Sequence, residues 1–139
     1  MDYQVGISSG CTYEMRDDGI AHFVFLNLKR DAVDVFVDTL KVIVQERVAA
    51  QQHSRTLVDA SLLTMPTPYA VKRFQELVID KPDKLRSSVA IITPSKMINT
   101  FTRTIFTRMP PDKKSHILLF NTEEEALLWL DARLEEVGP

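Results

Sequence analysis

The stretch RTLVDASLLTMPTPY, at residues 55–69, decides the fold prediction. Its first six residues, Arg55 to Ala60, form a short run rich in β-formers and predict a strand. Residues 61–68 follow as a loop, and Thr67 before Pro68 is typical of a helix start, with a hydroxyl at the N-cap and proline at the first helical position. The stretch therefore predicts a strand, a polar loop and a helix in direct succession.

Two more strands, each followed by a helix, are expected downstream. The apolar run at 88–93 predicts a strand, Thr93-Pro94 repeats the cap-and-proline signal, and a helix is expected from Ser95 to Met109, before two prolines. A last strand at 116–120 precedes Thr122 and three glutamates, a pattern typical of a capping box. Strands that alternate with helices favour a mostly parallel sheet with right-handed crossovers.

Upstream, the sequence predicts a β-hairpin and a long helix. Strands are expected at 12–16 and 20–28, joined by a tight turn at Asp18-Gly19, and apolar residues recur at helical spacing from Asp31 to Gln52. The second helix, 68–80, is expected to bury Val71, Phe74, Leu77 and Val78. The predicted fold class is α/β, with a mixed, mostly parallel five-stranded sheet and four helices in the order β-β-α-β-α-β-α-β-α.

Composition limits the classes of function. The chain has 139 residues, the size of one domain, and a formal net charge of -2, which argues against nucleic-acid binding. No apolar run reaches the ~20 residues that span a bilayer, so a membrane partner is not expected. Residues 1–10 lack the basic start and apolar core of a signal peptide, and Cys11 is the one cysteine. By default these features predict a cytoplasmic protein.

Ligands of open α/β sheets bind beyond the carboxyl ends of the parallel strands, where helix N-termini favour anions. The candidate partner- or ligand-binding residues at these ends are Asp59, Ser61, Thr64, Thr67, Tyr69, Thr93 and Ser95. Helix capping alone explains hydroxyls at Thr67, Thr93 and Thr122. A carboxylate at Asp59 is either bonded to loop amides or functional, and both interpretations stay open.

Several catalytic chemistries leave no trace in the sequence. His22, His53 and His116 are scattered, so no metal site is predicted. The glycines form no phosphate-binding loop and no nucleophile elbow, and nothing places a base beside a nucleophile. We therefore expect no cofactor and no enzymatic activity.

Three stretches carry a resemblance to a known family: TLVDAS at 56–61, VAIITPS at 89–95 and FNTEEEALLWL at 120–130. With its element order, the chain resembles STAS domains, the anti-sigma-factor antagonist-like fold, and most of all a bacterial branch that is also similar to lipid-binding Sec14-type domains. Antagonists of that family catalyse nothing. They bind a partner kinase, which phosphorylates a serine at the start of the second helix.

The family motif is Asp-x-Ser, a short spacer and Asp-Ser-Ser-Gly. Asp59-Ala60-Ser61 matches its first half, whereas residues 64–70 replace the second half. The resemblance places Tyr69 near the phosphoacceptor position and makes Thr67, two residues earlier, the candidate phosphoacceptor. A phosphate there would add negative charge at a helix N-terminus, where it is favourable.

Two hypotheses of function follow. The first is a non-enzymatic regulatory module that binds a protein partner, such as a regulatory kinase, through the loop 59–69 and the following helix. The alternative is a binding domain for a small anionic ligand, a nucleotide or a lipid, at the same strand ends. An enzyme that uses Asp59 and a hydroxyl ranks last.

Overall fold

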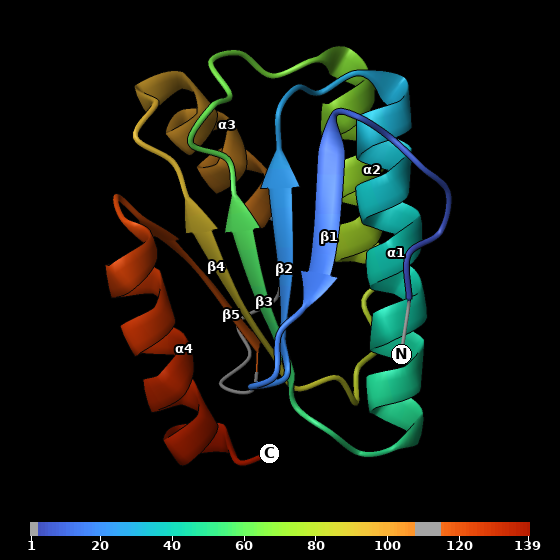
Figure 1. Cartoon of the computed structure of the whole chain (residues 1–139), viewed down its shortest axis with the longest axis vertical. Helices are drawn as coiled ribbons and strands as arrows, with labels where there is room; N and C mark the ends of the chain where they lie inside the picture. The colour runs from blue at the N-terminus through green and yellow to red at the C-terminus, as the bar shows by residue number, and fades with distance from the viewer. Residues whose placement is uncertain (1–2, 108–114) are drawn as a thin grey trace.

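The computed structural model describes residues 3–107 and 115–139. The described residues form an α/β domain, in which helices cover both faces of a five-stranded sheet (Figure 1). Its elements are β1 (Cys11–Met15), β2 (Ile20–Phe25), α1 (Arg30–Ala49), β3 (Ser54–Asp59), α2 (Pro68–Ile79), β4 (Ser87–Ile92), α3 (Lys96–Phe106), β5 (Ser115–Phe120) and α4 (Glu123–Val137). The predicted fold class and element order are confirmed.

The strands lie in the sheet in the order in which they occur in the chain. Strand β1 pairs antiparallel with β2, while β2, β3, β4 and β5 pair in parallel. The hairpin turns at Gly19, whose φ of 84° suits glycine, and Asp18 Oδ1 accepts a hydrogen bond from the Ile20 amide at 3.2 Å. The turn predicted at Asp18-Gly19 is therefore present.

A sheet that grows in one direction through right-handed crossovers places its crossover helices on one face. Helices α1, α2 and α3 share that face, and α4 packs on the opposite one (Figure 1). Because side chains alternate along a strand, β3 directs Thr56 and Val58 toward the three helices and Leu57 toward α4. The domain thus has two cores, divided by the sheet.

Aromatic rings build the core beneath α1. The Phe36 ring of α1 lies 4.9 Å from that of Phe23 and 5.1 Å from that of Phe25, and the Phe23 ring also lies 5.1 Å from Tyr13. Phe23 is fully buried. These contacts join the hairpin to the first helix.

Burial on the three-helix face differs from the prediction. In α2, Ala70 is buried, whereas the four side chains expected to be buried, Val71, Phe74, Leu77 and Val78, are only half-buried. In β4, Ala90 and Ile92 on the α4 side are buried, but Val89 and Ile91 are half-buried. The reason is a cavity between α2 and the sheet, described below, which five of these six half-buried side chains line; Val71 is the exception.

Helix boundaries differ in places from those expected. Helix α1 begins at Arg30 without a side-chain cap, and Asp31 accepts a hydrogen bond from Ser8 Oγ at 2.7 Å. In α3, Met97 is exposed. The predicted helix end at Met109 and the two following prolines lie outside the described residues.

A buried polar network joins α4 and the last residues to the sheet. Arg133 Nε donates to Ser88 Oγ at 2.8 Å, and Ser88 Oγ lies 2.8 Å from His53 Nε2. His53 Nδ1 lies 3.0 Å from the Gly138 carbonyl oxygen. One set of protons satisfies the network: Nδ1–H donates to Gly138, and the Ser88 hydroxyl donates to Nε2. Arg133 is therefore buried on α4, whereas the neighbouring Leu134 is half-buried.

This network gives stability a pH dependence. Burial is the main cause that lowers the pKa of His53 below its ordinary value, and the nearby Arg133 guanidinium acts in the same direction. Below about pH 6.5 the unfolded chain binds a proton at this histidine more readily than the folded protein does. The free energy of unfolding should therefore decrease as the pH is lowered from about 7 to about 5. In urea titrations, His53→Gln should make this decrease smaller. His116→Gln, which changes an exposed histidine, should leave it unaltered. Equal slopes in both variants would contradict this role.

Removal of the central aromatic contact should cost much more than a comparable change on the surface. We expect Phe23→Ala to lower the free energy of unfolding by about 3–5 kcal/mol, because it leaves a void beneath Phe36 and Tyr13. Leu128→Ala, at an exposed position on α4, should change it by less than about 0.5 kcal/mol. Chemical denaturation monitored by circular dichroism measures both values.

Candidate functional site

The loops that follow β3 and β4 lie at the same edge of the sheet. Asp59 pairs in register with Ile92, and the Ala60 amide donates to the Ile92 carbonyl oxygen at 2.9 Å. The residues after these pairs leave the sheet side by side. The geometry thus brings Asp59 and Ser61 near the start of the Thr93–Ser95 loop, as expected from parallel pairing.

Asp59 and Ser61 form a local turn. Asp59 Oδ1 accepts hydrogen bonds from the Ser61 amide at 2.9 Å and from the Ser61 hydroxyl at 2.5 Å. Of the two interpretations left open for Asp59, the structure shows the bond to a loop amide. Ser61 and Thr64 are exposed, so this part of the loop faces solvent.

Thr67 is the N-cap of α2, as predicted. Its hydroxyl accepts from the Ala70 amide at 3.2 Å and donates to the Leu28 carbonyl oxygen at 3.2 Å. The second bond ties the start of α2 to the segment between β2 and α1. A phosphate at Thr67 would remove the proton that this bond uses, so modification would loosen the contact as well as add charge.

Tyr69 belongs to the interface between α1 and α2. Its hydroxyl donates to Asp34, a bond that raises the pKa of Tyr69, and the Arg30 guanidinium lies 4.4 Å from the centre of its ring. Arg73 extends the interface with ion pairs to Asp34 at 3.3 Å and to Asp38 at 2.8 Å. Tyr69 therefore has partners on α1 rather than among the other candidate residues.

The cap predicted at Thr93 is wrong. Ser95 is the N-cap of α3, and its hydroxyl accepts from the Ile98 amide at 3.4 Å. The Thr93 amide instead donates to the Phe120 carbonyl oxygen at 2.9 Å, which continues the β4–β5 ladder past the end of the strand. Thr93 is only 2% exposed, and its hydroxyl has no hydrogen-bond partner within the part of the chain that the structure describes.

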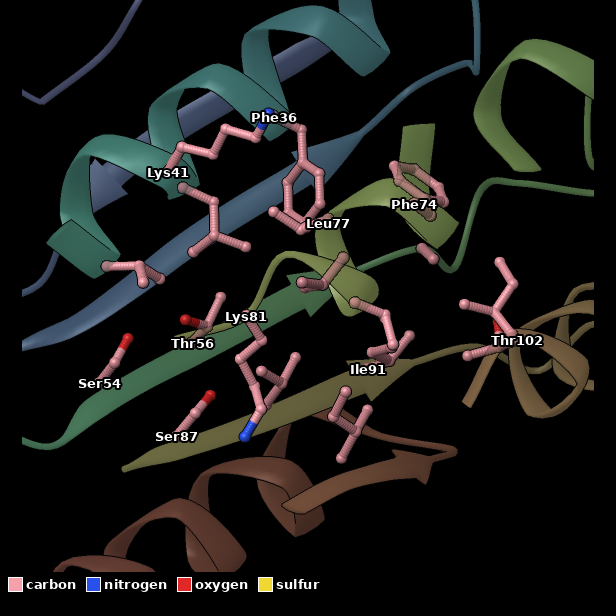
Figure 2. Close-up of a pocket in the computed structure, with 18 of the residues that line it drawn as sticks. Phe36, Lys41, Ser54, Thr56, Phe74, Leu77, Lys81, Ser87, Ile91 and Thr102 are labelled. Atoms are coloured by element: carbon pink, nitrogen blue, oxygen red, sulfur yellow. The ribbon is translucent and has the colours of Figure 1, made fainter. Parts of the chain in front are cut away.

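A cavity that the sequence analysis missed lies between the sheet and helices α1, α2 and α3. Its volume is about 400 Å³, and Figure 2 shows side chains of the sheet and helices that face it. The walls are mostly apolar. They include Phe36, Leu40 and Val44 of α1, Phe74, Leu77 and Val78 of α2, Ile98, Phe101 and Ile105 of α3, and Val58, Val89 and Ile91 of the sheet.

The sequence held one signal of this cavity. Strand residues that face a packed core are normally apolar, yet Ser54, Thr56 and Ser87 occupy strand positions on the three-helix face. Polar side chains at core-facing positions indicate that something other than a dry core lies opposite them. The apolar wall gave no such signal, because the same helical periodicity describes a packed interface and a hollow one.

Other chemistries find no support in the described residues. In residues 3–107 and 115–139, no group of three or more histidine, cysteine or acidic side chains is arranged to hold a metal ion. Over the same ranges, no helix combines the length and the apolar character needed to cross a bilayer. Burial raises the pKa of the Cys11 thiol to about 12, so this thiol is a poor nucleophile at neutral pH.

With this geometry established, comparison with known proteins adds no assignment. No protein-family model matches the chain, and no curated protein matches it. The resemblance to STAS domains therefore stays a prediction from the sequence.

The two hydroxyls after β4 can be separated by mutation. Ser95→Ala should lower the free energy of unfolding by about 0.5–2 kcal/mol, because it removes the cap of α3. Thr93→Val should be neutral or slightly stabilising, because it replaces a buried hydroxyl that lacks a partner. Urea titration of both variants is the measurement. A larger loss of unfolding free energy in Thr93→Val than in Ser95→Ala would indicate that Thr93, and not Ser95, caps α3.

Proposed function

We propose that this protein is a non-enzymatic binding module that holds an apolar small molecule between its sheet and helices α1–α3. The observation that carries the proposal is the cavity of about 400 Å³ with apolar walls. This volume lies within the ~300–1,000 Å³ typical of sites for small ligands. It is far larger than the voids left by imperfect packing, which seldom exceed one water molecule.

The partial exposure of the apolar side chains that line the cavity supports a bound molecule. Phe74, Leu77 and Ile91 are half-buried although they lie at core positions of α2 and β4. Apolar side chains beside an empty or hydrated space lose dispersion contacts on one side. A bound apolar molecule would restore these contacts and remove the side chains from water, which is the driving force for binding.

The cavity favours a lipid over a nucleotide. A nucleotide needs several polar groups for its base, ribose and phosphates, whereas most of the wall consists of aliphatic and aromatic side chains. The polar side chains gather mainly at one end, as the next subsection describes. This supports the lipid half of our second hypothesis, with the ligand placed beneath the helices instead of at the outer edge of the sheet.

A protein partner on the loop 59–69 is a second candidate function. Leu62 and Met65 in this loop are 62% and 64% exposed, and Met97 at the start of α3 is 53% exposed. Exposed apolar side chains on a loop are a common feature of contact sites. Intact-mass analysis of protein from its native host tests the regulatory form of this idea, which requires a phosphate on Thr67.

A neutral fluorescent probe tests the cavity. N-phenylnaphthylamine carries no charge and fluoresces strongly when it leaves water, so we expect saturable binding to the full-length protein. Val89→Phe should greatly weaken that binding, because the larger ring enters the cavity from β4. Leu128→Phe, which adds the same ring at an exposed position on α4, should leave binding intact. Saturable binding that survives Val89→Phe would show that the probe sits elsewhere.

A further inference from the structure

The cavity changes in polarity along the strands. The residues of β3 that line it are Ser54, Thr56 and Val58, one at every second position, and Ala60 follows beyond the strand. Ser54 pairs in register with Ser87 of β4, so two hydroxyls lie side by side at the amino ends of these strands. Toward the carboxyl ends, the strand residues that line the cavity are apolar (Figure 2).

Thr56 provides an independent sign of a ligand. Its side chain lines the cavity, its exposure is 0%, and its hydroxyl has no hydrogen-bond partner among the described residues. Buried hydroxyls are normally paired, because they lose their bonds to water on burial. An acceptor atom on a molecule in the cavity would give this hydroxyl a hydrogen-bond partner.

A cation lies at the same end. Lys81 follows α2 and lines the cavity, and Figure 2 shows its ammonium group directed toward Ser87. The other charged side chains that line the cavity are Lys41 of α1 and Asp80, so the charged side chains of the described wall include two cations and one anion. Hydroxyl donors beside the Lys81 ammonium favour an anionic acceptor such as a carboxylate.

The cavity also follows the strands lengthwise. The lining residues run from Ser54 at the start of β3 to Ala60 just beyond its end, a span of about 20 Å at the usual rise of ~3.3 Å per residue. Leu63 and Ile98, both buried and both apolar, also line the cavity. A long unbranched chain suits this shape better than a compact ring system.

We infer that the ligand is a long-chain fatty acid, with its carboxylate at Ser54, Thr56, Ser87 and Lys81 and its chain along β3 and β4 toward Ala60. This inference rests on the proposed function and makes it specific. The carboxylate would accept from the Thr56 hydroxyl and lie near the Lys81 ammonium. The acyl chain would fill the apolar end between the sheet and α2 and α3.

The test is displacement of bound N-phenylnaphthylamine from the delipidated full-length protein by a matched series of ligands. Palmitate should compete at least about tenfold better than hexadecanol, which has the same chain length without the charge. Palmitate should also compete better than octanoate, whose chain is too short to fill the cavity. Equal competition by palmitate and octanoate would overturn the placement of the chain.

Variants at the polar end complete the test. Thr56→Val and Lys81→Gln should each lower the affinity for palmitate severalfold, while the affinity for the probe stays the same. In Lys81→Gln, the affinity for hexadecanol should change less than that for palmitate. Lys84→Gln removes an exposed lysine of the same loop and is the matched control. Palmitate affinities that are equal in Lys81→Gln and Lys84→Gln would overturn the assignment of the head group.

The two proposals fail in different ways. If the probe binds saturably but palmitate competes no better than hexadecanol, the fatty-acid proposal is wrong and the proposal of an apolar binding module stands. Failure of both the probe and palmitate to bind would remove both proposals. If palmitate still binds to Val89→Phe, the cavity is not its binding site.

Discussion

Strand β3 is hydrogen-bonded to a parallel neighbour on each side, and this pairing constrains the rest of the domain. It requires that α1 and α2 both cross over the sheet between successive strands, on the same face. It also aligns Ser54 with Ser87 and Asp59 with Ile92, which sets what lies at each end of the sheet. A shift by one residue would exchange the two faces and bring Leu57 beneath the three helices.

The two faces of the sheet are covered differently. On one face, α4 packs against the sheet, and its Ala126 and Leu130 share with Leu57 and Ala90 a core whose buried members are 0–4% exposed. On the other face, three helices share the surface, and α2 and α3 are held over it by neighbouring contacts. The Phe74 ring lies 5.6 Å from Phe36 and 6.3 Å from Phe101, so aromatic rings span the interhelical gaps above the cavity.

Polar contacts also join α1 to α2. Arg73 holds Asp34 and Asp38 of α1, and the Tyr69 hydroxyl also binds Asp34. These contacts fix the two helices to each other. The polar side chains of Asp59, Thr67 and Ser95, where the strands end, already form a turn and two helix caps, so the interior offers a stronger case for a ligand than the loops do.

The sequence by itself determined the features that depend on near neighbours. The turn at Asp18-Gly19, the caps at Thr67 and Thr122 and the order of strands and helices all follow from residues within a few positions of one another. The role of Thr93 depended on Phe120, which lies on another strand, so the local cap pattern was misleading. The cavity and the buried network around His53 were decided only by the tertiary structure. Helical periodicity predicts which side of a helix faces the sheet, but the distance between the helix and the sheet depends on contacts between residues far apart in the chain.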